Sequence, residues 1–241
     1  MTRSAQSHQK PDCGRCGAHN RSEWSALDGA ELACLTRATR QNQYLPGETL
    51  FAQGAPCTGL FCVESGLVGT RRMDADGNSV LLQLAHPGET LGYGALFTGK
   101  VHALSAEALK PSTICFIEGT AIRARLDGSP ELCQRFMRHA VRDLNEAQDR
   151  ILRLATHTVR ARFARFLLDL VDPGKSEAGD TLSLELPVSR QDLAAMLGTR
   201  PETMSRAIRH LERAGIAHFR DRRVHVPAVG RLRDQAEHEL S

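Results

Sequence analysis

Residues 188–226 read VSRQDLAAMLGTRPETMSRAIRHLERAGIAHFRDRRVHV, and this stretch decides the fold of the C-terminal part of the chain. Ser189 favours the start of a helix, and Gly198 suits the left-handed turn that ends it. Thr199 is the predicted cap of a second helix, with Pro201 in its first turn. The stretch therefore predicts two helices joined by a turn, followed by a two-stranded wing over residues 219–226.

The second helix has the composition of a helix that reads DNA. Its apolar residues recur on one face, which leaves its polar residues for the major groove, where a recognition helix meets base edges. Arg206 is predicted to contact guanine with two donors, Glu202 to accept from cytosine, and Ser205 to meet a base or a phosphate. Arg200, Thr203 and Arg209 are predicted to bind the DNA backbone. An ion pair between Glu202 and Arg206 is the alternative, and it is compatible with base reading.

Positive charge is concentrated in this part of the chain. The whole sequence carries a formal net charge of +3, whereas residues 187–233 contain ten arginines and four acidic residues, a net of +6. Such a local excess attracts the phosphates of nucleic acids. A salt-bridged, solvated surface is the alternative.

Length and composition limit the class of protein. A chain of 241 residues holds one large or two ordinary domains. It has no apolar run near the ~18 residues that cross a bilayer, and its first residues lack the apolar core of a signal peptide. We expect a cytoplasmic protein with no membrane partner, whose seven cysteines are reduced, metal-bound or redox-active. The sequence contains no nucleophile–base pair, phosphate-binding loop or paired carboxylates of the kind that would predict an enzyme.

The N-terminal half predicts a different architecture. Residues 1–24 are polar and predict a loosely ordered arm, and residues 25–40 predict a short helix. From residue 43 to 118, short apolar runs alternate with glycine and proline, and Asp76-Gly77 is a hairpin signal. The pattern predicts an antiparallel β-roll, so the fold class is α+β.

A long helix is predicted from Pro130 to about residue 158. One stripe of it repeats in alternating steps of four and three residues, as in a coiled-coil seam. We expect this seam to form a homodimer, and packing against the chain's own roll is the alternative. The seam residues are Met137, Ala140, Leu144, Ala147, Ile151 and Leu154, and the flanking residues expected to face the roll are Leu132, Phe136, Val141 and Leu152.

Three glycine-rich motifs and the recognition helix together resemble the CRP/FNR family of bacterial transcription regulators. The motifs are PGETLFAQG at residues 46–54, SG at 65–66, PGETLG at 87–92 and PETMSR at 201–206. The resemblance covers nearly the whole chain, and the last motif is similar to that of the branch reading TTGAT-type half-sites. The resemblance implies an arm at residues 1–24, a β-roll sensor domain at 25–127, a dimerisation helix at 128–158 and a winged helix at 159–241. It also implies a homodimer on palindromic double-stranded DNA and contact with RNA polymerase, for which the hairpin at residues 70–79 is a candidate, with a solvated turn as the alternative.

The resemblance implies two kinds of signal. Members that bind cyclic AMP hold its phosphate with an Arg-Ser pair, but this chain has Leu104-Ser105-Ala106 there, and Tyr93 falls near the family's glutamate. Without the cation a cyclic phosphate loses its strongest contacts, so cyclic AMP is not expected. Oxygen-sensing members bind an iron–sulfur cluster, for which [4Fe–4S] is the candidate type, through N-terminal cysteines and a distant one. Cys13, Cys16 and Cys115 match these positions.

The set of cluster ligands is incomplete in this sequence. The family's third N-terminal cysteine is absent, because Ser22 and Trp24 stand where it would fall, and clusters usually take four thiolates. His19, Cys34 and an exogenous ligand are candidates for the fourth, whereas Cys62, Cys34 and Cys133 are more typical of small buried hydrophobes. Thiol redox sensing by Cys13 and Cys16 beside Arg15, a zinc knuckle with His19, and an arm without chemistry remain alternatives.

The sequence thus predicts a homodimeric DNA-binding regulator with a redox, oxygen or nitric-oxide input through these cysteines. No charged residue interrupts the seam, so we expect a dimer with or without a cofactor, and a signal that acts on the orientation of the DNA-binding domains. One alternative is the same regulator without a cluster, controlled by thiol oxidation or an unknown ligand in the roll. Another is a signalling module that does not bind DNA.

Overall fold

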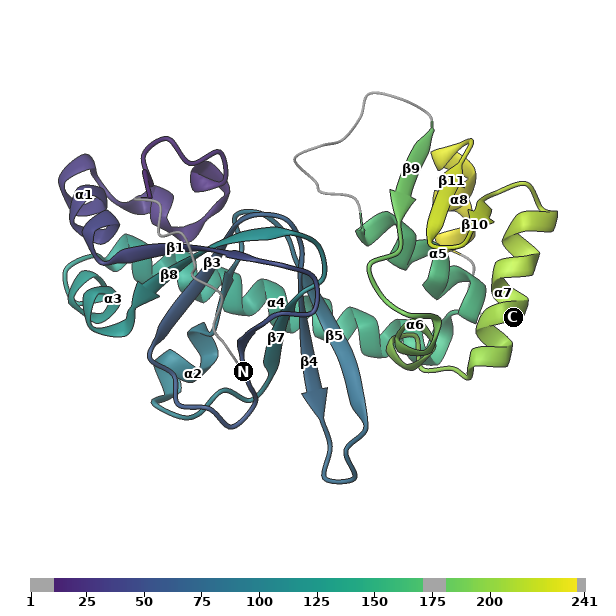
Figure 1. The fold of residues 1–241 in the computed structure, drawn as a ribbon, viewed down its shortest axis with the longest axis horizontal. Helices are drawn as coiled ribbons and strands as arrows, with labels where there is room; N and C mark the ends of the chain where they lie inside the picture. The colour runs from purple at the N-terminus through teal and green to yellow at the C-terminus, as the bar shows by residue number, and fades with distance from the viewer. Residues whose placement is uncertain (1–10, 171–180, 238–241) are drawn as a thin grey trace. The chain divides into compact units, whose positions relative to one another are not determined.

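The computed structural model describes residues 11–170 and 181–237 of the chain (Figure 1). These residues form two compact units, 1–143 and 144–241, and each is described on its own below. The sequence predicts that a helix ends at residues 172–174 and that a polar loop follows over residues 175–181, and these positions up to residue 180 lie outside the described residues. The α+β class with a β-roll, a long helix and a helix-turn-helix is confirmed.

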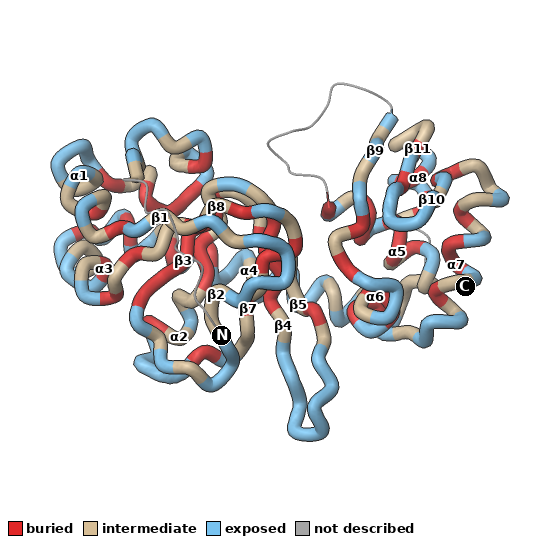
Figure 2. Tube along the Cα trace, viewed as in Figure 1, coloured by how far each residue is buried: buried red, intermediate tan, exposed pale blue. Residues whose placement is uncertain are grey.

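Two antiparallel four-stranded sheets make the roll. The first has the strand order β1 (Thr39–Tyr44), β8 (Ser112–Glu118), β3 (Gly59–Ser65) and β6 (Thr90–Leu91). The second has the order β2 (Thr49–Phe51), β7 (Ser105–Ala108), β4 (Val68–Met73) and β5 (Ser79–Ala85). Asp76-Gly77 lies in the β4–β5 turn, as predicted, and Figure 2 shows the tip of this hairpin as exposed. Two short helices, α2 (Tyr93–Thr98) and α3 (Gly119–Leu126), complete the roll.

Strand β3 is buried on both faces, because alternate side chains point to opposite sides of a sheet. Phe61 and Val63 belong to the core between the two sheets. Leu60 and Cys62 belong to a second core on the outer face of the first sheet. This second core includes Trp24, so the N-terminal segment covers the outer face of β3 and β8.

Residues 11–24 fold into turns and short helices, which corrects the prediction of a loose arm there, and the rest of that prediction, residues 1–10, lies outside the described residues. It forms the short helices η1 (His19–Arg21) and η2 (Glu23–Ala26) before α1 (Gly29–Arg37). Trp24 is 4% exposed and packs its ring edge on Phe136, with 5.4 Å between the ring centroids. Apolar burial of this size outweighs the polar composition on which the prediction rested.

The long helix α4 runs from Pro130 to Thr156, as predicted. Leu132, Phe136 and His139 are its buried residues. The predicted seam lies open: Met137 is 66% exposed and Ile151 is 67% exposed. Of the flanking residues expected to face the roll, Leu132 and Phe136 do, whereas Val141 and Leu152 are exposed, and that part of the prediction is wrong.

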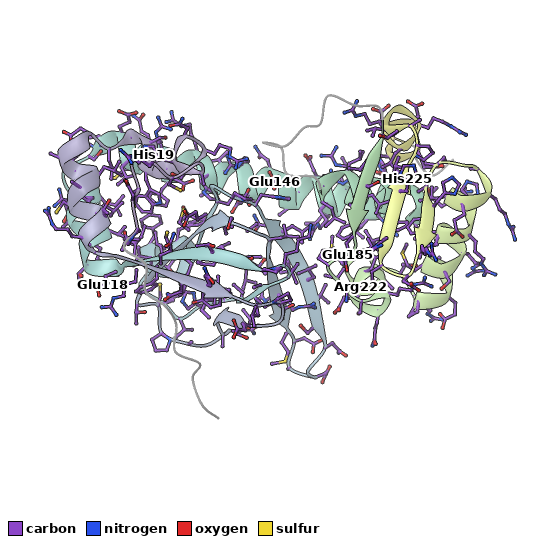
Figure 3. All side chains as sticks on the ribbon, turned by 45° about the horizontal axis from the view of Figure 1, so that its top comes forward. His19, Glu118, Glu146, Glu185, Arg222 and His225 are labelled. Atoms are coloured by element: carbon purple, nitrogen blue, oxygen red, sulfur yellow. The ribbon has the colours of Figure 1, made fainter. Side chains whose placement is uncertain are left out.

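The C-terminal unit contains the predicted helix-turn-helix. Its elements are α5 (Val159–Asp169), β9 (Leu182–Glu185), α6 (Arg190–Met196), α7 (Pro201–Arg213), β10 (His218–Arg220), β11 (Arg223–Val226) and α8 (Val229–Ala236). The wing is a three-stranded sheet in the order β10-β11-β9, and Figure 3 labels Glu185 on β9, Arg222 in the turn and His225 on β11. The sequence predicts a strand at residues 182–186, but it does not predict that this strand, β9, joins the wing.

Local signals set the ends of the two helices. The Ser189 side chain accepts a hydrogen bond from the backbone N–H of Asp192, and Gly198 has a φ of 61°. The cap of α7 differs from the prediction. The N-cap position is occupied by Arg200 rather than Thr199, and no side chain caps the helix. Proline at the first position needs no hydrogen bond to its nitrogen, which reduces the need for a cap. None of the described helices is long and apolar enough to cross a membrane.

Candidate functional site

Four cysteines line one small cavity beneath the N-terminal segment. Cys13 and Cys16 enter it from the turns that precede η1, and Cys62 and Cys115 enter it from β3 and β8. The other lining residues are Pro11, Asp12, Ala18, His19, Ser22, Trp24, Gln41 and Glu64. The structure therefore brings the three predicted cluster ligands together, and it adds Cys62, which was expected to be a buried hydrophobe.

The register of the sheet places Cys62 beside Cys115. The two residues are direct partners in the antiparallel β3–β8 pairing, and both belong to the outer face of the sheet. Side chains in such a pair have Cβ atoms about 4.5–5.5 Å apart. Cys115 Sγ also lies 3.8 Å from the Glu64 carboxylate, which accepts a hydrogen bond from Gln41.

The cavity is small compared with a metal cluster. Its volume is about 30 Å³, which is space for about two water molecules. Within the two described ranges, no three histidine, cysteine or acidic side chains stand close enough together to hold a metal ion. In kind and number, however, four thiols match the set of four cysteine thiolates that holds iron–sulfur clusters. The donor chemistry thus fits a cluster, provided that the wall of the cavity moves outward around it.

Three of the thiols that face the cavity, those of Cys16, Cys62 and Cys115, are held in their neutral form. Burial raises the pKa of Cys62 to about 12, although the Thr90 hydroxyl and the Trp24 indole act in the opposite direction. Burial also raises the pKa of Cys115, and the neighbouring Cys62 and Glu64 raise it further. The pKa of Cys16 is raised by burial, against the backbone N–H groups of Ala18 and His19. Since the thiolate is the reactive species, these cysteines are poor nucleophiles while no metal is bound.

Arg15 does not give Cys16 the low pKa that thiol redox sensing requires. Its guanidinium is exposed and pairs with Asp12 across 3.8 Å. Because burial dominates the pKa of Cys16, a cation on the surface does not offset it. This geometry weighs against the alternative in which Cys16 reacts directly with oxidants.

The positions expected for a third N-terminal cysteine also line the cavity. Ser22 and Trp24 are both buried there. The Trp24 Nε1 atom is buried and has no hydrogen-bond partner among the described residues. A buried donor without a partner costs about 1–3 kcal/mol, so each one calls for an explanation. Trp24 thus supplies this cavity with an N–H group that makes no hydrogen bond of regular geometry, although the indole is close enough to Cys62 to lower the pKa of that thiol.

The remaining cysteines lie outside the cavity. Cys34 lies on α1, where its sulfur is 3.5 Å from an Arg125 nitrogen. Cys57 donates to the Gly59 carbonyl at 3.4 Å, and Cys133 is exposed and donates to the Leu126 carbonyl. Cys34 was a candidate for the fourth ligand, and its position removes it from the cavity wall.

A buried ion pair joins the cavity segment to α4. Glu23, which lies between Ser22 and Trp24, is buried, and its Oε1 atom lies 2.5 Å from His139 Nδ1. Asp143 lies 3.4 Å from the other ring nitrogen of His139 and accepts a hydrogen bond from Tyr93. None of these polar residues was singled out from the sequence for this role, because a lone Glu or His gives no periodic signal.

The pKa values of this pair agree with its geometry. Burial opposes the charged form of His139, but the hydrogen bond and charge of Glu23 outweigh it and raise the pKa of the imidazole. Burial likewise opposes the charge on Glu23, and the His139 interactions and the Thr90 hydrogen bond still lower the pKa of that carboxyl. Both shifts favour the charged forms, the Glu23 carboxylate and the His139 imidazolium.

The recognition helix presents its predicted contact residues on the surface. Glu202, Arg206 and Arg209 are exposed, while Met204, Ile208 and Leu211 are buried, as predicted. Arg206 Nη2 donates to Thr203 Oγ1 at 3.0 Å, and within the described residues Arg206 forms no ion pair with Glu202. Ser205 donates its hydroxyl to the Pro201 carbonyl at 3.0 Å. The Arg206 guanidinium is therefore free of a carboxylate partner in this part of the structure.

A basic groove of about 560 Å³ runs along α7 and the start of α5. Arg206 and Arg209, predicted from the sequence, line it together with Arg160 and Arg213, which were not predicted. The Arg160 guanidinium lies 3.1 Å from His210 Nδ1, and burial together with the charges of Arg160 and Arg213 lowers the pKa of His210. Arg160 escaped prediction because it lies 40 residues or more before the recognition helix in the sequence.

The positions that bind cyclic nucleotides in the family have other contacts here. The Tyr93 hydroxyl binds Asp143 of α4, and its ring packs near Phe136. The Ser105 hydroxyl accepts a hydrogen bond from the Gln53 backbone at 2.9 Å.

Comparison with known proteins identifies both units. A cyclic nucleotide-binding domain matches residues 41–128, and a Crp-like helix-turn-helix domain matches residues 161–235. The nitrogen fixation regulation protein FixK of Bradyrhizobium diazoefficiens is 30% identical over 203 residues, 84% of each chain. The chain belongs to the CRP/FNR family of bacterial transcription regulators.

Other members of the family extend the likeness. The transcriptional activator protein Anr of Pseudomonas aeruginosa is 27% identical over 180 residues, which cover 75% of this chain and 73% of that protein. The solved structure of FixK2 from Bradyrhizobium japonicum superposes with a TM-score of 0.70 at 25% identity, over 82% of this chain and 96% of the other. The solved structure of a CRP/FNR-family regulator from Thermus thermophilus superposes with a TM-score of 0.68 at 28% identity, over 82% of this chain and 98% of the other. This chain is accordingly a DNA-binding transcription regulator and not an enzyme.

Proposed function

We propose that this CRP/FNR-family member is a homodimeric regulator that reads a palindrome of TTGAT-like half-sites and senses oxygen, nitric oxide or redox state through its cysteine cavity. The observation that carries the sensing half of the proposal is the cavity itself, which gathers Cys13, Cys16 and Cys115 under one segment. The DNA-reading half rests on the exposed residues of α7 and the family motif at residues 201–206.

Base reading is assigned to the exposed face of α7. Arg206 contacts guanine with two donors, and Glu202 accepts from cytosine. Ser205 meets a base or a phosphate from its position between them. Arg200, Thr203 and Arg209 bind backbone phosphates, and the groove adds Arg160 and Arg213 to that set.

The dimer is assigned to the exposed stripe of α4. Met137, Leu144, Ile151 and Leu154 are large apolar side chains that water contacts along this helix. Ala147, which stands between Leu144 and Ile151, is also exposed. Such a stripe is stabilised when a second copy of the helix covers it, and a two-fold dimer matches a palindrome.

Sensing is assigned to an iron–sulfur cluster held by Cys13, Cys16 and Cys115. When bound, such a cluster supplies a centre that oxygen and nitric oxide attack. The protein's own part is to supply thiols that would release their protons as iron binds, to exclude bulk water beneath Trp24, and to connect the cavity to α4 through Glu23. Because Tyr93 and Ser105 already have partners, cyclic AMP is not the proposed ligand.

The DNA half of the proposal is tested by anaerobic binding to a fluorescent duplex carrying the palindrome, against a duplex with scrambled half-sites. We expect specific binding to be about 10³-fold or more tighter than non-specific binding. Equal affinity for both duplexes would contradict sequence reading and favour a module that does not bind DNA specifically.

The sensing half is tested by the absorption spectrum and the iron, sulfide and zinc content of protein purified without oxygen. Bound iron and sulfide that are lost in air and in Cys115→Ala support the cluster. Zinc without sulfide supports a zinc knuckle with His19 instead. A metal-free protein leaves thiol oxidation or an unknown ligand in the roll.

A further inference from the structure

We propose that Cys62 is the fourth thiolate of the cluster site, completing the set begun by Cys13, Cys16 and Cys115. The inference rests on the proposed iron–sulfur site and names the ligand that the family comparison leaves open. It predicts a ligand set with two cysteines from the N-terminal turns and two from adjacent strands of the sheet.

Position is the first argument for Cys62. It lines the same cavity as the other three cysteines, and it is the direct cross-strand partner of Cys115. The β3–β8 pairing fixes these two sulfurs on one face of the sheet, about one cross-strand spacing apart. No other cysteine among the described residues lines the cavity.

The competing ligands have weaker claims. Cys34 contacts Arg125 and does not line the cavity. His19 and Glu64 do line it, but iron–sulfur clusters are held by thiolates in most proteins, and Glu64 is already hydrogen-bonded to Gln41. Cys62 therefore offers the donor atom that clusters usually take, a cysteine sulfur.

An independent observation is the unused donor of Trp24. This side chain is 4% exposed, lines the cavity, and leaves its Nε1 atom without a partner among the described residues. Sulfur atoms of a cluster and its thiolates accept hydrogen bonds, and such bonds tune the cluster's potential. A sulfur-rich group in this cavity would give the indole N–H an acceptor in regular hydrogen-bond geometry.

The architecture also allows the cavity to enlarge. Cys62 and Cys115 are fixed by the sheet, whereas Cys13 and Cys16 precede η1 in a segment of turns. The backbone bonds there are short-range, such as that from Arg15 to Asp12 and that from His19 to Cys16. Moving these turns outward makes room for a cluster without disturbing either sheet.

The test measures iron and acid-labile sulfide per protomer, with the absorption spectrum, after anaerobic reconstitution of the full chain with ferrous iron and sulfide. The variants are Cys62→Ser and Cys62→Val, since valine keeps an apolar side chain at this buried position. Cys115→Ser is the positive control. Cys57→Ser is the matched negative control, because Cys57 is also partly buried just before β3 but lies outside the cavity.

We expect both Cys62 variants to lose iron and sulfide by about tenfold or more, as Cys115→Ser does, while Cys57→Ser stays loaded. Circular dichroism of the metal-free variants checks that they fold. Folded Cys62 variants with the wild-type amounts of iron and sulfide would overturn the inference while the cluster proposal stands. A wild-type chain that binds neither iron nor sulfide would overturn both.

A second series does not depend on the folding of the Cys62 variants. His19→Ala, Cys34→Ser and Glu64→Gln each remove one competing ligand from an otherwise native chain. Full loading of all three supports Cys62 by elimination. Loss of the cluster in any of them assigns the fourth position to that residue and contradicts the inference. Trp24→Phe should keep the cluster but shift its reduction potential, because the N–H donor is lost while an aromatic ring is kept.

Discussion

Glu23 and His139 form a buried ion pair that joins the cysteine cavity to the long helix α4. Glu23 Oε1 lies 2.5 Å from His139 Nδ1, and both side chains are almost fully enclosed. The residues on either side of Glu23, Ser22 and Trp24, line the cavity. Any movement of the cavity wall therefore reaches α4 through a contact one residue away. This pair gives the cavity a physical route to the helix that is proposed to form the dimer.

We predict that Glu23→Gln lowers the free energy of unfolding. Removing one partner of a buried ion pair costs up to about 3–5 kcal/mol, reduced by the extent to which His139 gives up its proton. Urea unfolding followed by the fluorescence of Trp24, the one tryptophan of the sequence, measures the change. Glu118→Gln is the control, since its exposed pair with Arg40 contributes about 1 kcal/mol or less. Equal stabilities of the two variants would contradict a structural role for the pair.

The same pair predicts a specific pH dependence of stability. The pKa of His139 is raised, so its contribution is complete below about pH 6.5 and is lost as the pH rises through the folded pKa. The pKa of Glu23 is lowered, so its contribution is complete above about pH 4.3 and is lost as the pH falls through the folded pKa. The charged or titratable groups that act on the pair are Asp143, Arg142, Tyr93 and Glu89.

The measurement is the free energy of unfolding of the metal-free protein against pH, for the wild-type chain and for His139→Gln. We expect the difference between them to be largest between about pH 4.3 and 6.5 and to shrink at higher pH. A difference that stays constant up to about pH 9 would show that folding does not raise the pKa of His139.

Arg206→Ala should relax base discrimination. If Arg206 reads guanine, its loss costs about 1–3 kcal/mol against the palindrome and little against non-specific DNA. Arg209→Ala is the matched control on the same helix: a phosphate contact weakens binding to all sequences alike and lowers the salt slope by about one. Fluorescence anisotropy at several salt concentrations separates the two effects. Uniform weakening by both substitutions would assign Arg206 to the backbone instead.

The stripe on α4 should form a dimer whether or not the cavity is filled. The stripe positions are all apolar, so no charged side chain in the stripe would repel its counterpart in a second copy. Analytical ultracentrifugation at micromolar concentration should find a dimer for the loaded and the metal-free chain. Ile151→Glu, in the stripe, should give monomers, and Gln148→Glu, which lies off the seam, should not. A monomeric wild-type chain would contradict this assignment.

Local signals made much of the fold predictable. The cap at Ser189, the positive φ at Gly198 and Pro201 at the start of α7 act within a few residues, so the helix-turn-helix could be predicted from the sequence. The short apolar runs and the Asp76-Gly77 turn likewise indicated the roll. The order of the N-terminal segment was missed, because it depends on the burial of Trp24 against Phe136, which is far away in the sequence.

The cysteine site was predictable only in part. Cys13, Cys16 and Cys115 came from a family resemblance, and the structure places them in one cavity. Cys62 could not be found in this way, because its position beside Cys115 depends on the register between β3 and β8. Glu23 and His139 are 116 residues apart, and nothing in either local sequence indicates the pair.

The most direct test of the account compares the DNA affinity of one anaerobic preparation before and after its iron and sulfide are lost in air. If the cavity controls the DNA-binding unit, the dissociation constant for the palindrome should change by a coupling of about 1–3 kcal/mol, roughly 5- to 150-fold. The chain should remain a dimer throughout. An unchanged dissociation constant after complete loss of iron and sulfide would contradict the claim that this cavity senses the signal.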